Sequence, residues 1–366
     1  MRGGWRALGL LWTLVLVALA GGVGTLAWLG PPPPGQVVEA PAAAPEPVAP
    51  APVAAAQPAP APTPEAAPPA PAPVAMPSAP EPPPLAGADG RRTDGATIAA
   101  LDPQLQEPGR HGPLPRLSAD SRSSIRVYAR AFDRADPRPR IGIVINNFGL
   151  FAQHSDEAIR RLPGAVTLAF SPYALRPDLL LERARARGME VLIALPLEPQ
   201  GFGQQADPGD RALLTSLPVN QNMDRLDWAL SRIQGYVGAI GGLGGMRGER
   251  FAANADLLGA VQQTLTQRGL LYVYPRPGAP TPARAFGRSV DVLLDEPSAV
   301  RSEVERRLAG LEALARSQGS ALGLANDPAP SVVAAIAAWA AGLEDRGAVI
   351  APITVLIRRP SDQAVR

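Results

Sequence analysis

The chain of 366 residues contains no cysteine and only two histidines, His111 and His154. The absence of cysteine excludes disulfide bonds and thiolate metal ligands, and imidazole chemistry is limited to two positions. Lysine is also absent, so all 35 basic residues are arginine, and 33 acidic residues reduce the net charge to +2. Because the arginines form no dense run with interleaved aromatic residues, the sequence gives no support for nucleic-acid binding.

One apolar run without charge lies near the N-terminus, over residues 7–29. The run is long enough to cross a bilayer, and Arg2 and Arg6 before it place the N-terminus in the cytoplasm by the positive-inside rule. Residues 1–30 are therefore predicted to form a single-pass inner-membrane anchor, with the remainder of the chain in the periplasm. The alternative is a cleavable signal peptide, because residues 18–20 form a small-x-small cleavage pattern.

The 44 prolines are concentrated in the first third of the chain. Residues 31–124 consist largely of Pro, Ala, Glu, Gln and Gly, a composition that cannot bury enough apolar surface to offset the entropy lost on folding. We predict a disordered linker over this range, extended by its prolines to a reach on the order of 100–200 Å. Such a linker either lets a domain search the cell envelope or serves as a simple tether.

Residues 125–366 alternate between strand and helix signals. Eight apolar runs predict strands, at residues 141–146, 165–170, 190–195, 236–241, 270–274, 290–294, 321–325 and 348–353. Segments of helical periodicity predict helices at residues 156–162, 177–188, 223–235, 298–317 and 331–343. The strands do not alternate between apolar and polar residues, which is typical of parallel strands buried on both faces. The pattern predicts an α/β domain with a barrel-like or strongly curved sheet, and a doubly wound open sheet is the alternative.

In such folds, ligand-binding residues follow the carboxyl ends of the strands. Polar and aromatic residues occupy these positions after most of the predicted strands. We therefore expect one edge of the sheet to hold Asn146, Asn147, Tyr173, Glu198, Tyr274, Arg276, Asp295 and Asn326.

Six segments of this part of the chain resemble the divergent polysaccharide deacetylases. They are RIGIVINNFG (140–149), LPGAVTLAFSPYAL (162–175), ALPLEPQGF (194–202), AIGGLGGMRGERF (239–251), YPRP (274–277) and LANDPAP (324–330). The resemblance covers nearly all of residues 125–366, and the second and third segments are the most specific. It implies a NodB-like deformed (β/α) barrel and the removal of acetyl groups from amino sugars. In that reaction a divalent metal, held by an aspartate and two histidines, polarises the amide and activates water.

The resemblance also shows that the positions of the metal chemistry are changed in this chain. Asn146 and Asn147 stand at the aspartate pair, Ala194 at a histidine, Gly242 in the Asn-His loop, and Asn326 at a histidine of a late strand. An amide oxygen carries no charge and cannot act as a base. We therefore expect a degenerate member of the family, with no resident metal or other cofactor and no deacetylase catalysis.

The predicted function is non-catalytic binding of an envelope glycan, or of an envelope protein that handles glycans. Tyrosines offer stacking surfaces to sugars, and charged side chains offer bidentate hydrogen bonds. The candidate ligand-binding residues are Tyr173, Glu198, Tyr274, Arg276 and Asp295.

Two alternatives remain open. One is an active metal-dependent carbohydrate deacetylase with a displaced site, for which His154, Glu198 and Asp295 are the candidate ligands. His154 also has a simpler interpretation, because it precedes a helix start that Ser155 or Asp156 is expected to cap. The other alternative is a structural scaffold of the cell envelope without a ligand.

Overall fold

The computed structural model describes residues 97–360. The predicted membrane anchor over residues 1–30 and most of the predicted linker lie outside the described residues. Within residues 97–360, no helix combines the length and apolar character needed to cross a membrane.

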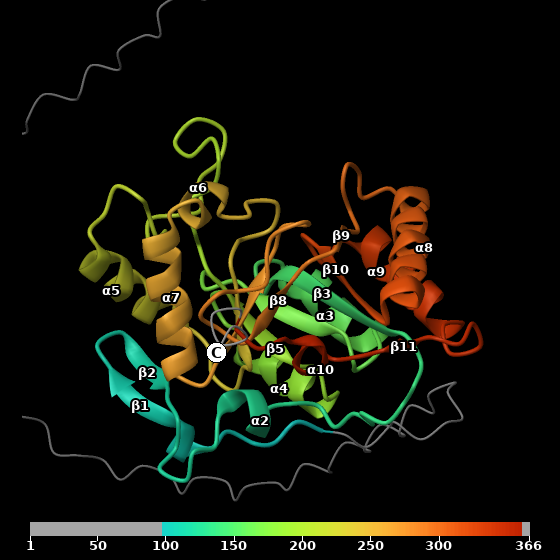
Figure 1. The fold of residues 1–366 in the computed structure, drawn as a ribbon, viewed down its shortest axis with the longest axis horizontal. Helices are drawn as coiled ribbons and strands as arrows, with labels where there is room; N and C mark the ends of the chain where they lie inside the picture. Colours follow the sequence, from blue (N-terminus) through green and yellow to red (C-terminus); the bar gives the residue numbers. More distant parts are fainter. Residues whose placement is uncertain (1–96, 361–366) are drawn as a thin grey trace, which may run out of the picture. The chain divides into compact units, whose positions relative to one another are not determined.

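The described residues form an α/β half-barrel around nine parallel strands (Figure 1). The strands lie in the order β8-β7-β6-β5-β4-β3-β10-β9, and β11 pairs with the beginning of β3. Because the end strands β8 and β9 do not pair with each other, the sheet stays open. The bounds are β3 Arg140–Phe148, β4 Thr167–Phe170, β5 Val191–Ala194, β6 Gly238–Ile240, β7 Leu271–Tyr274, β8 Gly287–Ser289, β9 Val292–Leu293, β10 Ser320–Ala325 and β11 Val349–Ile350.

Helices connect most of the strands; α3 to α9 cover one face of the sheet, whereas α10 packs against β3 from the other face. Figure 1 shows α5 and α7 together at one side of the sheet and α8 and α9 together at the other. The bounds are α3 Ala152–Arg161, α4 Asp178–Ala186, α5 Val219–Leu230, α6 Glu249–Ala252, α7 Ala255–Gln267, α8 Arg301–Gln318, α9 Pro330–Ala341 and α10 Ile353–Leu356.

The start of α3 differs from the prediction. The helix begins at Ala152 with Phe151 as its N-cap, so capping by Ser155 or Asp156 is wrong. Ser155 is fully buried, and its hydroxyl accepts a hydrogen bond from the Gly149 amide at 3.0 Å while it donates to the Phe151 carbonyl at 2.9 Å. The Ser155 side chain therefore fastens the first turn of α3 to the end of β3.

Both faces of the sheet are buried, as the apolar runs predicted. Ile143 and Ile145 of β3 pack in the core cluster that includes the helices. Val144 of β3 and Leu322 and Leu324 of β10 belong to a second cluster on the opposite, concave face. Alternate residues of one strand thus serve two cores, which explains why the strand sequences show no polar alternation.

The N-terminal part of the described chain closes the concave face. Ile98, Leu105 and Tyr128 are 6%, 1% and 2% exposed and belong to the second cluster. This segment contains η1 (Pro103–Leu105), β1 (Gln106–Gly109), β2 (Gly112–Pro115) and α2 (Ser124–Val127). The folded domain therefore extends at least to residue 97, and the boundary predicted at residue 125 is corrected.

Candidate functional site

A polar network lies at the carboxyl ends of β3 and β10. Asn326, the residue after β10, is 8% exposed. Its amide N–H donates to Asp295 Oδ2 at 2.7 Å, and its side-chain Nδ2 donates to Asp295 Oδ1 at 3.0 Å and to Glu296 Oε1 at 2.9 Å. Two carboxylates therefore hold the Asn326 amide group in a fixed orientation.

The two asparagines of β3 complete this network. Asn146 is fully buried; its Nδ2 donates to the Gly242 carbonyl at 3.0 Å, and its Oδ1 accepts from the Asn147 amide at 2.9 Å. Asn147 has a φ of 56° and donates from Nδ2 to Asp327 Oδ1 at 2.7 Å. Of the residues expected at one edge of the sheet, Asn146, Asn147, Asp295 and Asn326 lie in this network, which also includes the Gly242 carbonyl.

A glycine-rich hairpin, residues 241–248, lies against this network and is called the glycine hairpin below. Leu243 and Met246 exchange two backbone hydrogen bonds of 2.9 Å, which close its tip. A side chain at Gly244 would place its Cβ 2.5 Å from Asn147 Nδ2, so the hairpin backbone approaches Asn147 as only glycine allows.

Arg247 ties the glycine hairpin to the segment that follows β9. Its guanidinium donates to Glu296 through two bonds, of 2.8 Å to Oε1 and 2.7 Å to Oε2. The fork geometry makes this a strong charge-assisted contact. Arg247 was not among the residues singled out from the sequence, where the available signal was a single charged residue inside a glycine-rich loop.

Asp295 has an unusual protonation equilibrium. Burial raises the pKa of its carboxyl group to about 6, and the nearby negative charge of Asp327 acts in the same direction. The hydrogen bond from the Asn326 backbone opposes this change only in part. The network thus holds a carboxyl group that exchanges its proton near neutral pH.

Glu198 is buried, 2% exposed, and its hydrogen bonds are made inside the protein. Oε2 accepts from the Thr215 hydroxyl at 2.6 Å, and Oε1 pairs with Arg250 Nε at 3.1 Å. Thr215 was not identified from the sequence, because nothing in the pattern links it to Glu198. These contacts leave Glu198 little capacity to bind a ligand.

Four of the candidate ligand-binding residues, Tyr173, Glu198, Tyr274 and Arg276, make contacts with different neighbours. Tyr173 packs on Trp228 with ring centroids 5.3 Å apart. Tyr274 is 7% exposed and meets the Arg276 guanidinium 6.0 Å from its ring centroid. Among the described residues, the hydrogen bonds and ring contacts place the four side chains in three separate groups.

The displaced metal site considered from the sequence is not assembled either. His154 is exposed on α3, where its ring contacts Phe151 at a centroid distance of 5.9 Å. Within residues 97–360, no group of three or more His, Cys, Asp or Glu side chains is arranged to hold a metal ion. His154, Glu198 and Asp295 therefore do not form a common site.

The residues at the family's metal positions do not fit the metal that the resemblance implies. Both amide atoms of Asn146 are engaged in internal hydrogen bonds. Ala194 is fully buried in the second core cluster, and Gly242 contributes only backbone atoms. Neither Ala194 nor Gly242 offers a side-chain donor, whereas a divalent ion of this kind needs imidazole and carboxylate ligands.

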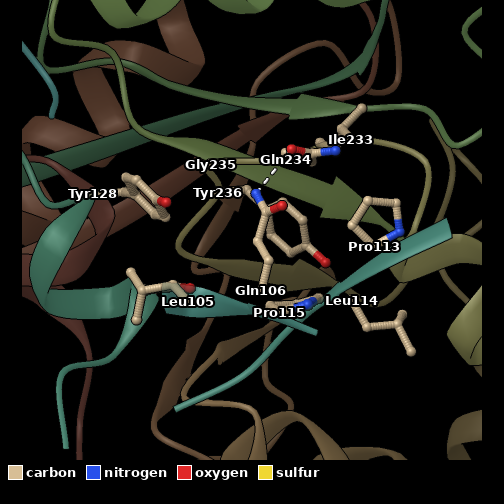
Figure 2. Close-up of a pocket in the computed structure, with 11 residues that line it drawn as sticks. Leu105, Gln106, Pro113, Leu114, Pro115, Tyr128, Ile233, Gln234, Gly235 and Tyr236 are labelled. Atoms are coloured by element: carbon tan, nitrogen blue, oxygen red, sulfur yellow. Dashed lines mark hydrogen bonds between the residues drawn. The ribbon is translucent and has the colours of Figure 1, made fainter. Parts of the chain in front are cut away.

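One small cavity lies far from this network along the chain and the sheet, near the N-terminal end of β6. Figure 2 shows it between the β1–β2 hairpin and residues 233–236, with Gln106 Nε2 donating to Gln234 Oε1 at 2.8 Å. Its volume is about 10 Å³, which is room for about one water molecule. The cavity is therefore too small for a sugar.

Comparison with known proteins gives a family match. The sequence model of the family described as "Divergent polysaccharide deacetylase" matches residues 143–357. A protein from Haemophilus influenzae, described only as uncharacterized, is 23% identical over 213 residues, which are 54% of this chain and 70% of that protein.

Two solved structures are also similar. A crystal structure of an uncharacterized protein from Agrobacterium tumefaciens has a TM-score of 0.61 and 33% identity, and the match covers 67% of this chain and 99% of that one. The catalytic domain of a peptidoglycan N-acetylglucosamine deacetylase from Eubacterium rectale has a TM-score of 0.37 and 13% identity, over 61% of this chain and 92% of that domain.

Proposed function

Because the chain belongs to the divergent polysaccharide deacetylase family, we propose that it is a non-catalytic member that acts by binding a partner in the cell envelope. The observation that supports this proposal is the internal use of most of the polar groups at the sheet edge; the Oδ1 atoms of Asn147 and Asn326 are buried without a hydrogen-bond partner among the described residues. Asn146 and Asn326 are fixed by hydrogen bonds within the protein, and the glycine hairpin is tied across the edge by Arg247 and Glu296.

The same contacts favour a protein partner over a glycan held at the sheet edge. Two residues expected to bind a sugar make contacts inside the protein instead. Glu198 accepts a hydrogen bond from Thr215 and pairs with Arg250, and Tyr173 packs on Trp228. We further propose that residues 7–29 anchor the protein in the inner membrane and that the domain faces the periplasm, since the apolar run and the flanking arginines have the required order.

The test is acetate release from N-acetylated glucosamine oligomers by the purified full-length protein, with and without added zinc or other divalent ions. We expect no turnover above buffer. Chelator-sensitive turnover by the unmodified protein would establish an active deacetylase and end the non-catalytic proposal. The same incubation with immobilised oligomers reports glycan binding, which we expect to be undetectable.

Two variants distinguish a chain that lacks a deacetylase site from one whose site is covered by the glycine hairpin. Arg247→Ala removes the ion pair that ties the glycine hairpin to Glu296; activity gained by this variant would mean that the hairpin covers a working site. Restoring aspartate at both Asn146 and Asn147 should still give no turnover, because Ala194 and Gly242 provide no metal ligand.

A further inference from the structure

A cluster of arginine and aromatic side chains lies on α5 and the loops beside it, away from the polar network. Trp228 is half-buried, and the guanidinium carbons of Arg232 and Arg211 lie 5.6 Å and 5.9 Å from its ring centroid. Tyr173 contacts the same Trp228 ring at 5.3 Å, and Arg225 is close enough to lower the pKa of Tyr173 by its charge, against the larger effect of burial. Tyr173, Arg211, Arg225, Trp228 and Arg232 are called the arginine–aromatic surface below.

The guanidinium groups of this surface are held mainly by backbone oxygens. Arg232 Nε donates to the Pro172 carbonyl at 3.2 Å, and Arg225 donates to the Ala212 carbonyl. Within residues 97–360, neither Arg225 nor Arg232 takes part in an ion pair. Arg211 meets Asp210 at 3.7 Å, but the Asp210 side chain is 81% exposed, so this contact is weak.

Arginine side chains held in this way are preorganised to bind a planar anion such as a carboxylate. Arg232 uses only Nε for the Pro172 carbonyl, so the edge made by its two terminal nitrogens stays free, and that edge matches the two oxygens of a carboxylate. The stacking and the carbonyl contacts also reduce the side-chain entropy that binding would cost. The surface therefore offers preorganised guanidinium donors that no carboxylate of the described residues pairs with strongly.

The composition of the surface favours an acidic peptide over an anionic membrane or a phosphate polymer. Asp207 and Asp210 lie within electrostatic range of Tyr173 and moderate the positive charge, whereas anionic membranes select dense clusters of four to eight basic residues. Leu175, two residues after Tyr173, is 93% exposed and is available to an apolar group of a ligand. Trp, Tyr and Arg are the residues most enriched at the centres of protein interfaces.

We propose that the arginine–aromatic surface is the docking site for a carboxylate-rich peptide segment of a partner protein. This inference rests on the proposed function, because it names the kind of partner that a non-catalytic member would bind. Arg211 and Arg232 pair with carboxylates of the segment, and Tyr173 and Leu175 contact its apolar atoms.

The test uses the full-length protein in detergent and fluorescently labelled poly-L-glutamate, at about 0.15 M salt, where long-range attraction is largely screened. We expect saturable binding, weakened roughly three- to tenfold by Arg232→Ala and by Arg211→Ala, as for loss of one charge-assisted contact. Arg232→Lys keeps the charge but not the fork, and should lose nearly as much. Arg301→Ala is the matched control, since Arg301 is exposed on α8, at the other side of the sheet from α5 (Figure 1).

Several outcomes overturn the inference. They are no binding of poly-L-glutamate, equal weakening by Arg301→Ala, full binding by Arg232→Lys, or tighter binding to polyphosphate or to vesicles containing phosphatidylglycerol. Circular dichroism of each variant confirms that it is folded. If poly-L-glutamate does not bind and no acetate is released, the docking surface is refuted and the proposed function stands. If acetate is released and poly-L-glutamate binding depends on the arginines, the proposed function is refuted and the docking surface stands.

Discussion

The packing of the glycine hairpin onto the half-barrel is tested most directly at Gly248, the residue where the hairpin ends. Gly248 has a φ of +59°, and a Cβ at this position would lie 2.6 Å from Leu197 Cβ. Gly248→Ala therefore introduces two separate costs, a left-handed backbone conformation and a collision with a buried side chain.

The two costs have different magnitudes and can be separated within the same chain. The left-handed conformation costs a residue with a side chain about 1–2 kcal/mol, and overpacking a well-packed site costs about 1–3 kcal/mol. Gly278 supplies the control, because its φ is +74° and nothing lies within 4 Å of its Cβ position. We expect Gly278→Ala to lose about 1–2 kcal/mol of unfolding free energy and Gly248→Ala about 2–5 kcal/mol.

The measurement is urea unfolding of the two variants and the unmodified protein, followed by far-ultraviolet circular dichroism. The restriction that alanine places on the unfolded chain is the same in both variants, so it cancels in the comparison. The slope of the unfolding free energy with urea should be unchanged if both variants unfold from the same compact state. Equal losses for the two variants would refute the close packing of the glycine hairpin on Leu197.

Three further predictions follow from buried polar groups. The folded protein binds more protons than the unfolded chain between about pH 4 and pH 6, because the pKa of Asp295 is raised to about 6 against about 3.9 in unfolded chains; its contribution to stability therefore falls as pH rises through this window, by up to about 3 kcal/mol. Asp295→Asn should flatten that part of the stability profile measured by urea unfolding, and an unchanged profile would contradict the assignment. Tyr272→Phe should raise the unfolding free energy by about 1 kcal/mol, because the hydroxyl is fully buried and has no hydrogen-bond partner among the described residues; a measured loss would reveal a partner. Glu198→Ala should lower the free energy of unfolding by about 2–3 kcal/mol, because Thr215 and Arg250 lose their buried acceptor. Urea unfolding measures this loss, and an unchanged free energy of unfolding would mean that Glu198 is exposed to solvent.

The main strands could be predicted from sequence because they are buried on both faces. Each of the eight predicted apolar runs overlaps a strand of the sheet. β8 (Gly287–Ser289) was missed because a Gly-Arg-Ser segment has no apolar run. It is a strand only because its backbone pairs with Tyr272, Val273 and Tyr274 of β7, and such pairing leaves no local mark in the sequence.

The domain boundary was misplaced for a related reason. A Pro- and Gly-rich segment predicts disorder when its composition is averaged, yet the averaging hides isolated apolar residues. Ile98, Leu105 and Leu114 are each 6% exposed or less. Ile98 and Leu105 are buried against the concave sheet face, and Leu114 in the core cluster that includes the helices. The segment itself encodes neither surface, so composition alone could not locate the start of the domain.

At the candidate site, the sequence predicts where a side chain lies, but only the fold determines which partners it contacts. Strand position predicts that Asn146 and Asn326 lie at one sheet edge, because parallel strands end together. The availability of a side chain is a different property, since it depends on which partners reach it. Thr215 lies 17 residues from Glu198 in sequence, and Arg247 lies 49 residues from Glu296; only the folded chain brings each pair together. A family motif therefore locates a site, but the hydrogen bonds already made there decide whether the site can still act on a ligand.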